Sequence, residues 1–191
     1  MTTLTLSLDS VLELTDVQFS KLCQRNPDLR LERTAQGELV AMAPTGGESS
    51  RRNADLCFEL VAWNRKQNLG VVFDSSGGFM LPNGAIRSPD VAWVRLERWD
   101  ALSPQQREKF LPLSPDFVLE LRSVTDNLAA IQAKMREYMA NGVRLGWLLD
   151  PQTQGVEVYT DGAVTALQAP EILSGGEVLP GFVLKLREFY R

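Results

Sequence analysis

Two short and almost purely apolar segments, separated by an amphipathic stretch, constrain the fold of this chain more than any other feature. Residues 117–121 read FVLEL and residues 145–149 read LGWLL, which is typical of strands covered on both faces. Between them, apolar side chains recur at helical spacing and stop before a glycine: Leu128, Ile131, Met135, Tyr138 and then Gly142. The pattern predicts buried strands at 117–121 and 145–149, with a helix over 127–141 packed on them.

Further segments predict the remaining strands. Residues 29–33 and 38–42 flank Gln36-Gly37, and residues 154–160 and 163–167 flank Asp161-Gly162, so each pair predicts a hairpin. Three more short apolar segments predict strands: 71–74, 79–81 and 90–94.

Three other segments predict helices, at 15–24, 48–68 and 99–110. Thr15 or Asp16 is expected to cap the first, and Gly70 to close the second. Ser103 is expected to cap the third, with Pro104 at its first position.

Leaving aside the surface segment 99–110, the predicted order of elements is αββαββββαβββ, with no repeat or linker. We therefore expect one α/β domain over residues 1–191, with a mixed β-sheet flanked by α-helices. An N-terminal helix and hairpin would occupy 15–43, a core 46–160, and a C-terminal hairpin and tail 154–191.

The chain contains no histidine. Ser-His-Asp and Cys-His catalysis, HExxH peptidase chemistry and the usual zinc sites are therefore excluded in their standard forms. No phosphate-binding glycine motif is present, and Cys23 and Cys57 form no CxxC pair. Any hydrolytic chemistry would depend on carboxylates, lysine, a hydroxyl or a metal bound by oxygen, which favours Mg²⁺, Mn²⁺ or Ca²⁺.

The N-terminal segment has no basic leader before an apolar run, and it carries Asp9 and Glu13. This does not resemble a secretory signal, and no segment approaches the roughly 20 apolar residues that a membrane span needs. We expect a cytoplasmic protein with reduced thiols and no membrane partner.

The formal net charge of −4 is unlike that of a protein covered with basic residues for nucleic-acid binding. Such a function would need positive charge gathered locally. The basic side chains fall into three groups: Arg51, Arg52, Arg65 and Lys66; Arg87, Arg95 and Arg98; Arg122, Lys134, Arg136 and Arg144. Each residue taken singly can also be ordinary solvated surface.

Several charged residues stand where the pattern calls for apolar ones. Glu120 interrupts a strand, and alternation puts Arg122 on the same face. Asp90 begins another strand, Glu48 begins the long helix, and Lys134 lies at the edge of the apolar face of helix 127–141. An aspartate on one strand and Glu-x-basic on a neighbour suits a metal-dependent phosphodiesterase, with carboxylates for the ion and a cation for the phosphate.

Each of these residues also has a purely structural explanation. Glu48 can stabilise a helix N-terminus, and Asp90 can accept hydrogen bonds in a turn. Glu120 and Arg122 can form an ion pair, and the Lys134 stem can cover apolar surface.

Five segments, in order, carry a family resemblance: PTGGE at 44–48, SPDVAW at 88–93, FLPLSPDFVLELRS at 110–123, KMREYMANGVRLGWLLDP at 134–151 and LPGF at 179–182. On these segments the chain resembles the Uma-two family, restriction-endonuclease-like proteins of the PD-(D/E)xK superfamily.

The resemblance implies acidic site positions at Glu48, Asp90 and Glu120. It also implies that the catalytic motif is Asp90 followed by Glu120-Leu121-Arg122, with arginine where lysine is usual. Arginine stays protonated and cannot take a proton from water. Two interpretations follow: Lys134 supplies the missing cation from the adjacent helix, or the site binds metal or nucleic acid and cleaves poorly.

The leading hypothesis is a Mg²⁺- or Mn²⁺-dependent endonuclease acting on DNA rather than RNA. Asp90, Glu120, Arg122 and Lys134 would be catalytic, with metal ligands Glu48, Asp90 and Glu120 and nucleic-acid contacts from Arg51, Arg52 and Arg87. We also expect a homodimer. The alternatives are a non-catalytic module that binds nucleic acid or protein, and a structural homodimer paired through exposed apolar strands such as the one around Phe79.

Overall fold

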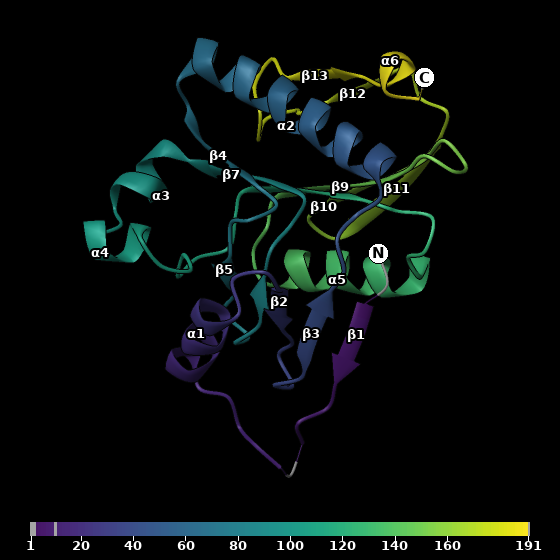
Figure 1. Cartoon of the computed structure of the whole chain (residues 1–191). Helices are drawn as coiled ribbons and strands as arrows, with labels where there is room; N and C mark the ends of the chain where they lie inside the picture. The colour runs from purple at the N-terminus through teal and green to yellow at the C-terminus, as the bar shows by residue number, and fades with distance from the viewer. Residues whose placement is uncertain (1–2, 10, 191) are drawn as a thin grey trace.

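The computed structural model describes residues 3–9 and 11–190 as three β-sheets with helices packed around them (Figure 1). The strands are β1 (Thr3–Leu6), β2 (Arg30–Arg33), β3 (Leu39–Met42), β4 (Gly70–Asp74), β5 (Phe79–Met80), β6 (Ile86–Arg87), β7 (Val91–Arg95), β8 (Phe117–Leu121), β9 (Leu145–Asp150), β10 (Gly155–Thr160), β11 (Ala163–Gln168), β12 (Ile172–Ser174) and β13 (Val183–Lys185). The helices are α1 (Asp16–Arg25), α2 (Gly47–Gln67), α3 (Leu96–Asp100), α4 (Pro104–Arg107), α5 (Leu128–Ala140) and α6 (Leu186–Phe189).

The central sheet has six strands in the order β11-β10-β9-β8-β7-β4. The two apolar segments form its middle: β8 and β9 are parallel neighbours, and the other pairs are antiparallel. Helix α5 connects β8 to β9, as a parallel pair requires. The expected mixed sheet flanked by helices is confirmed.

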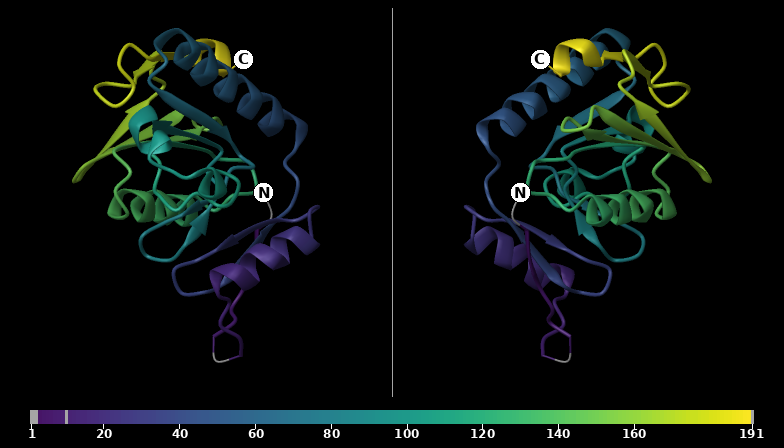
Figure 2. Two further views of the ribbon diagram at one scale, coloured as in Figure 1. Left: turned by 90° about the vertical axis from the view of Figure 1, so that its left-hand side faces the viewer. Right: turned by 90° about the vertical axis from the view of Figure 1, so that its right-hand side faces the viewer.

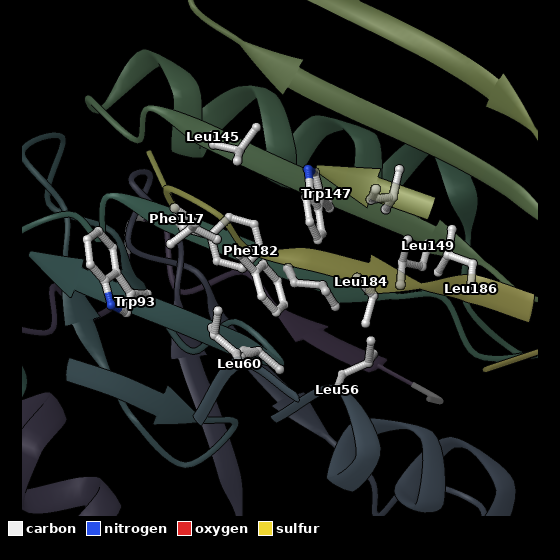
Figure 3. Packing of buried hydrophobic residues seen from close by; sticks show 14 of the residues in the cluster. Leu56, Leu60, Trp93, Phe117, Leu145, Trp147, Leu149, Phe182, Leu184 and Leu186 are labelled. Carbon is white, nitrogen blue, oxygen red and sulfur yellow. The ribbon is translucent and has the colours of Figure 1, made fainter. Parts of the chain in front are cut away.

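Side chains of the central sheet alternate between two cores. One face packs under α2 and the C-terminal β12, β13 and α6, where Leu60, Trp93, Phe117, Trp147 and Phe182 lie together (Figure 3). The other face packs on α5 through a core that includes Val118, Met135 and Leu148. Glu120 has the parity of Val118, so its side chain belongs to the α5 side.

The N-terminal sheet, defined as β1-β3-β2-β6-β5, lies with α1 on the α5 side of the central sheet, away from α2 (Figures 1 and 2). The β2–β3 hairpin is confirmed, and Gly37 in its turn has φ +83°, which favours glycine. The prediction of one sheet was wrong for this part of the chain. The segments 3–6 and 86–87 are too short to show the alternation of apolar and polar residues that would have revealed a second sheet.

The strand around Phe79 was wrongly expected to be exposed. Phe79 is fully buried, and β5 pairs with β6 and bridges to Leu111. Its apolar side chains are needed inside the molecule, so this strand does not offer a surface for pairing between chains.

Two helix predictions also needed correction. The single helix expected over 99–110 is wrong. The end of α3 covers residues 99–100 and α4 covers 104–107, because Ser103, held extended before Pro104, begins a new helix as its N-cap. Helix α2 ends at Gln67 and is capped by Asn68, which takes the left-handed conformation with φ 54°, whereas Gly70 starts β4. Gly70 is required there because a Cβ would lie 2.3 Å from the Val94 carbonyl oxygen.

Other features of the sequence prediction are confirmed. Thr15 caps α1, and Gly142 follows α5 with φ +91°. The β10–β11 hairpin turns through Gly162, and both cysteines are free. Across residues 3–9 and 11–190, none of the helices has the length and apolar content needed to cross a membrane.

Candidate active site

Asp90 lies immediately before β7 and is 6% exposed. One carboxylate oxygen accepts the Leu121 backbone N–H at 2.9 Å, and the other accepts the Asn53 side-chain amide at 3.1 Å. The first bond ties Asp90 to the end of β8, and the second ties it to α2. Burial raises the pKa of Asp90 despite these hydrogen bonds.

Glu120, on β8, is the second buried carboxylate, at 8% exposed. Its Oε1 accepts the Tyr138 hydroxyl at 3.0 Å and lies 2.9 Å from Lys134 Nζ. Burial, together with repulsion from Asp90 and Glu32, raises the pKa of Glu120 to about 7, although Lys134 opposes the shift. Lys134 therefore does not fully offset the cost of burying the Glu120 charge beside two other carboxylates.

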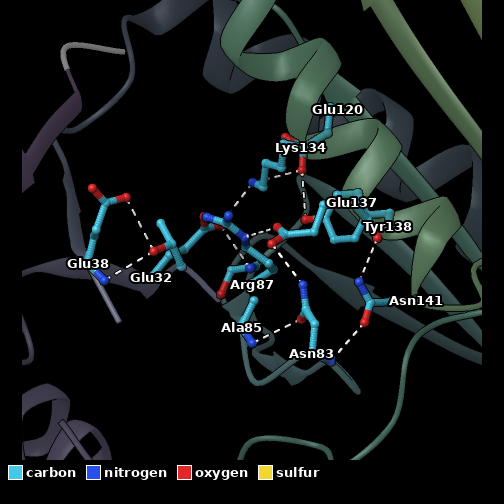
Figure 4. Close-up of polar contacts among 12 residues, drawn as sticks. Glu32, Glu38, Asn83, Ala85, Arg87, Glu120, Lys134, Glu137, Tyr138 and Asn141 are labelled. Atoms are coloured by element: carbon cyan, nitrogen blue, oxygen red, sulfur yellow. Dashed lines mark hydrogen bonds and ion pairs between the residues drawn. The ribbon is translucent and has the colours of Figure 1, made fainter. Parts of the chain in front are cut away.

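Lys134 projects from α5 toward Glu120 and toward the N-terminal sheet (Figure 4). Its Nζ lies 2.9 Å from Glu32 Oε1 as well as 2.9 Å from Glu120 Oε1. Burial lowers the pKa of Lys134, but the two carboxylates raise it by more, so the side chain is a fixed cation. Sequence placed Lys134 at the edge of the core, and the structure puts its charge beside Glu120.

Arg87 and two glutamates continue this network (Figure 4). Arg87 donates to Glu32 at 3.1 Å and to Glu137 at 2.6 Å. Glu32 also accepts the Ser88 backbone N–H at 2.9 Å. Burial raises the pKa of Glu32, but Lys134 and Arg87 outweigh it and the pKa lies below its usual value.

These side chains line one pocket of about 490 Å³ between the N-terminal sheet, β8 and α5. Its lining includes six acidic residues, Glu32, Glu38, Asp90, Glu120, Asp126 and Glu137, and two basic ones, Arg87 and Lys134. The surplus of carboxylates favours a bound cation, and without one it would repel a phosphate.

Arg122 does not lie beside Glu120 as predicted. Strand β8 ends at Leu121, which pairs with Leu149, so Arg122 meets Asp150 at the end of β9. The Arg122 guanidinium lies 2.7 Å from the Asp150 carboxylate and also donates to the Asp126 backbone carbonyl. The alternative of a structural Glu120–Arg122 ion pair is also wrong, because Arg122 pairs with Asp150.

Glu48 is also apart from the expected ligand set. It lies in the exposed first turn of α2, where Arg51 and Arg52 hold its carboxylate at 2.7 and 3.1 Å. Arg51 additionally pairs with Asp55 at 2.8 Å. The positive charges proposed for nucleic-acid contact at Arg51, Arg52 and Arg87 are therefore all compensated by carboxylates.

Among the residues that the structure describes, no three Asp, Glu, His or Cys side chains form a cluster that could hold a metal ion. The three-carboxylate set of Glu48, Asp90 and Glu120 is therefore not assembled. Asp90 and Glu120 alone still suit Mg²⁺ or Mn²⁺, because Mg²⁺ is commonly held by one or two carboxylates and keeps several waters. The acidic surplus of the pocket supports this smaller set.

Three residues of the site were missed from the sequence. Asn53 precedes the buried Leu56 and Leu60 by three and seven positions, so helical spacing could have placed it facing the sheet. Tyr138 was identified as an apolar-face residue, without its hydroxyl bond to Glu120. Glu32 left no signal, because its partners come from distant segments.

The six-stranded mixed sheet, its flanking helices and the carboxylate pocket define a restriction-endonuclease-like protein. A family model named Uma2, described as "Putative restriction endonuclease", matches residues 16–187. The chain belongs to the Uma2 family, as the resemblance predicted.

A solved chain described as a "putative nuclease belonging to DUF820" from Anabaena variabilis ATCC 29413 is similar, with a TM-score of 0.72 and 16% sequence identity. The alignment covers 84% of this chain and 89% of that chain. At this identity the likeness shows the shared fold alone. No curated protein sequence matches the chain.

Proposed function

We propose that this protein is a metal-dependent endonuclease that hydrolyses DNA phosphodiester bonds. The observation that carries the proposal is the convergence of Asp90, Glu120 and Lys134 in one acidic pocket. Membership of the Uma2 family supports the same activity. DNA is preferred to RNA on the family's description as a restriction endonuclease.

In this proposal Asp90 and Glu120 would hold Mg²⁺ or Mn²⁺, which when bound would activate a water and stabilise the leaving oxygen. Lys134 provides a compact cation for the charge that develops on the phosphate. Arg122 stays with Asp150 and takes no direct part. Arg51 and Arg52 contact the nucleic-acid backbone by exchanging carboxylate partners for phosphates. Arg87, the third residue predicted to contact nucleic acid, instead stays with Glu32 and Glu137.

Plasmid nicking with Mg²⁺ or Mn²⁺ tests the proposal, with Asp90→Asn as the matched variant. This substitution should fold, because Asn53 Oδ1 has no hydrogen-bond partner in the described structure and can accept from the new amide. We expect nicking by the wild type that EDTA and Asp90→Asn abolish. Equal nicking by the wild type and Asp90→Asn would contradict the proposed site.

A second candidate is a non-catalytic module that binds nucleic acid. The observation that favours it is that Arg122, at the motif's usual lysine position, is held outside the pocket lining by Asp150. Mobility shifts at low and high salt, with no cutting under any divalent ion, would support this function over cleavage.

We further propose a cytoplasmic homodimer, in which two copies of the site would cut both strands at one position. Light scattering with chromatography tests the mass, and linear rather than nicked plasmid tests paired cutting. The interface must involve a surface other than the buried strand at Phe79.

A further inference from the structure

Glu32 is a charged residue in the interior of a strand that does not belong to the central sheet. It lies on β2, between β3 and β6 of the N-terminal sheet, and is only 2% exposed. A buried carboxylate is costly unless it is paired and hydrogen-bonded. Its partners therefore indicate why it is there.

Both oxygens of Glu32 are occupied. Oε1 accepts from Lys134 Nζ and from the Ser88 backbone N–H, each at 2.9 Å, and Oε2 accepts from Arg87 at 3.1 Å. The Ser88 and Arg87 bonds fix the carboxylate from the segment that leads into β7. Glu32 thus presents a fixed anion to Lys134.

Lys134 is held between two carboxylates with different surroundings. On the Glu120 side it shares Oε1 with the Tyr138 hydroxyl. On the Glu32 side it meets a carboxylate whose position backbone and arginine bonds already set. If Glu120 serves as a metal ligand, the Glu32 contact would still hold the Lys134 ammonium.

We propose that Glu32 is a positioning residue that holds the Lys134 ammonium at the phosphate while Glu120 serves the metal. The inference rests on the proposed nuclease function. The N-terminal sheet then forms part of the catalytic arrangement, because it supplies the residue that aims Lys134. A purely structural role would instead fasten β2 to α5 without affecting turnover.

A double-mutant cycle on kcat separates these roles, using Glu32→Gln, Lys134→Met and the double variant with Mn²⁺. Supporting groups of this kind typically contribute about 10- to 100-fold. We expect Glu32→Gln to lower kcat by about 10- to 100-fold in the wild type, and to cause no further loss when Lys134 is already methionine. Equal losses in both backgrounds, or no loss in the wild type, would overturn the proposal.

The matched control is Asp116→Asn. Asp116 is equally buried at 2% exposed, accepts the Arg95 backbone N–H at 2.9 Å and pairs with Arg98 at 3.0 Å, outside the pocket lining. We expect it to lower the melting temperature without changing kcat. If kcat falls together with the melting temperature in both Glu32→Gln and Asp116→Asn, then Glu32 is only a structural residue.

A readout that needs no activity is the side-chain ¹⁵N signal of the Lys134 ammonium, assigned by its loss in Lys134→Met. An ammonium held in ion pairs should be protected from solvent exchange, and Glu32→Gln should broaden or remove its signal, whereas Asp116→Asn should not. An unchanged signal in Glu32→Gln would overturn the positioning role. A wild type that never cuts DNA would instead reject the nuclease function, so the two failures are distinguishable.

Discussion

Two ion pairs lie at the end of β8, Glu120–Lys134 and Arg122–Asp150. They differ in how fully the cation neutralises the carboxylates around it. Arg122 pairs with the Asp150 carboxylate. Burial raises the pKa of Asp150, but the hydrogen bonds from Arg122 and from the Gln152 N–H outweigh it and keep this pKa below its usual value. Lys134 must serve both Glu120 and Glu32, with Asp90 nearby, and the pKa of Glu120 rises to about 7. A satisfied pair stabilises the fold, whereas an unbalanced buried group is typical of a functional site.

The largest expected effect separates the two cations. Lys134→Ala should lower the cleavage rate by roughly 100- to 1000-fold, the usual loss when a charge-stabilising group is removed. Arg122→Lys should leave the rate close to that of the wild type, because Arg122 contacts Asp150 rather than the pocket. Single-turnover cleavage with Mn²⁺ measures both. Intact cleavage by Lys134→Ala together with loss in Arg122→Lys would reverse the assignment.

This contrast also shows how far the sequence alone could reach. The apolar strands, α5 and its glycine stop follow from local patterns, and so does the place of Lys134 at the core edge. The partner of Arg122 depends on the register of β8 with β9, which no single segment contains. The contact of Glu32 with Lys134 joins residues 102 positions apart, so only the assembled sheets could reveal it.

The second prediction concerns how the stability contributed by Glu120 depends on pH. The pKa of Glu120 rises from 4.5 to about 7 on folding, so the folded protein keeps a proton there that the unfolded chain releases. Stability from this group is present below about pH 4.5 and is lost as the pH rises through about 7. Over the whole of this pH range the loss should be on the order of 3–4 kcal/mol, at about 1.4 kcal/mol per pKa unit.

Urea unfolding of the metal-free protein between pH 5 and pH 8 measures this loss. Glu120→Gln should flatten the decline, and Mn²⁺ should restore the stability of the wild type at pH 8. An identical pH dependence of stability in the wild type and Glu120→Gln would show that the pKa of Glu120 is not raised by folding.

A smaller effect is expected at the Arg122–Asp150 ion pair. Asp150→Asn should lower the free energy of unfolding by about 1–3 kcal/mol, as expected when a hydrogen bond to a charged group is lost. Because the pKa of Asp150 is lowered in the fold, this contribution should be present at neutral pH and disappear as the solution is acidified. Cleavage should be unchanged at a temperature where the variant is folded. A loss of cleavage without a loss of stability would place Asp150 in the active site.

Mn²⁺ binding by isothermal titration tests most directly the central claim that the Glu120 pocket, and not its neighbours, has negative charge available for a metal. The wild type should bind, and Asp150→Asn and Glu48→Gln should bind as the wild type does. Glu120→Gln should weaken binding at least about 10-fold, because even groups that only support a metal ligand contribute that much. Equal affinity in the wild type and Glu120→Gln, or a loss confined to Glu48→Gln, would contradict the account.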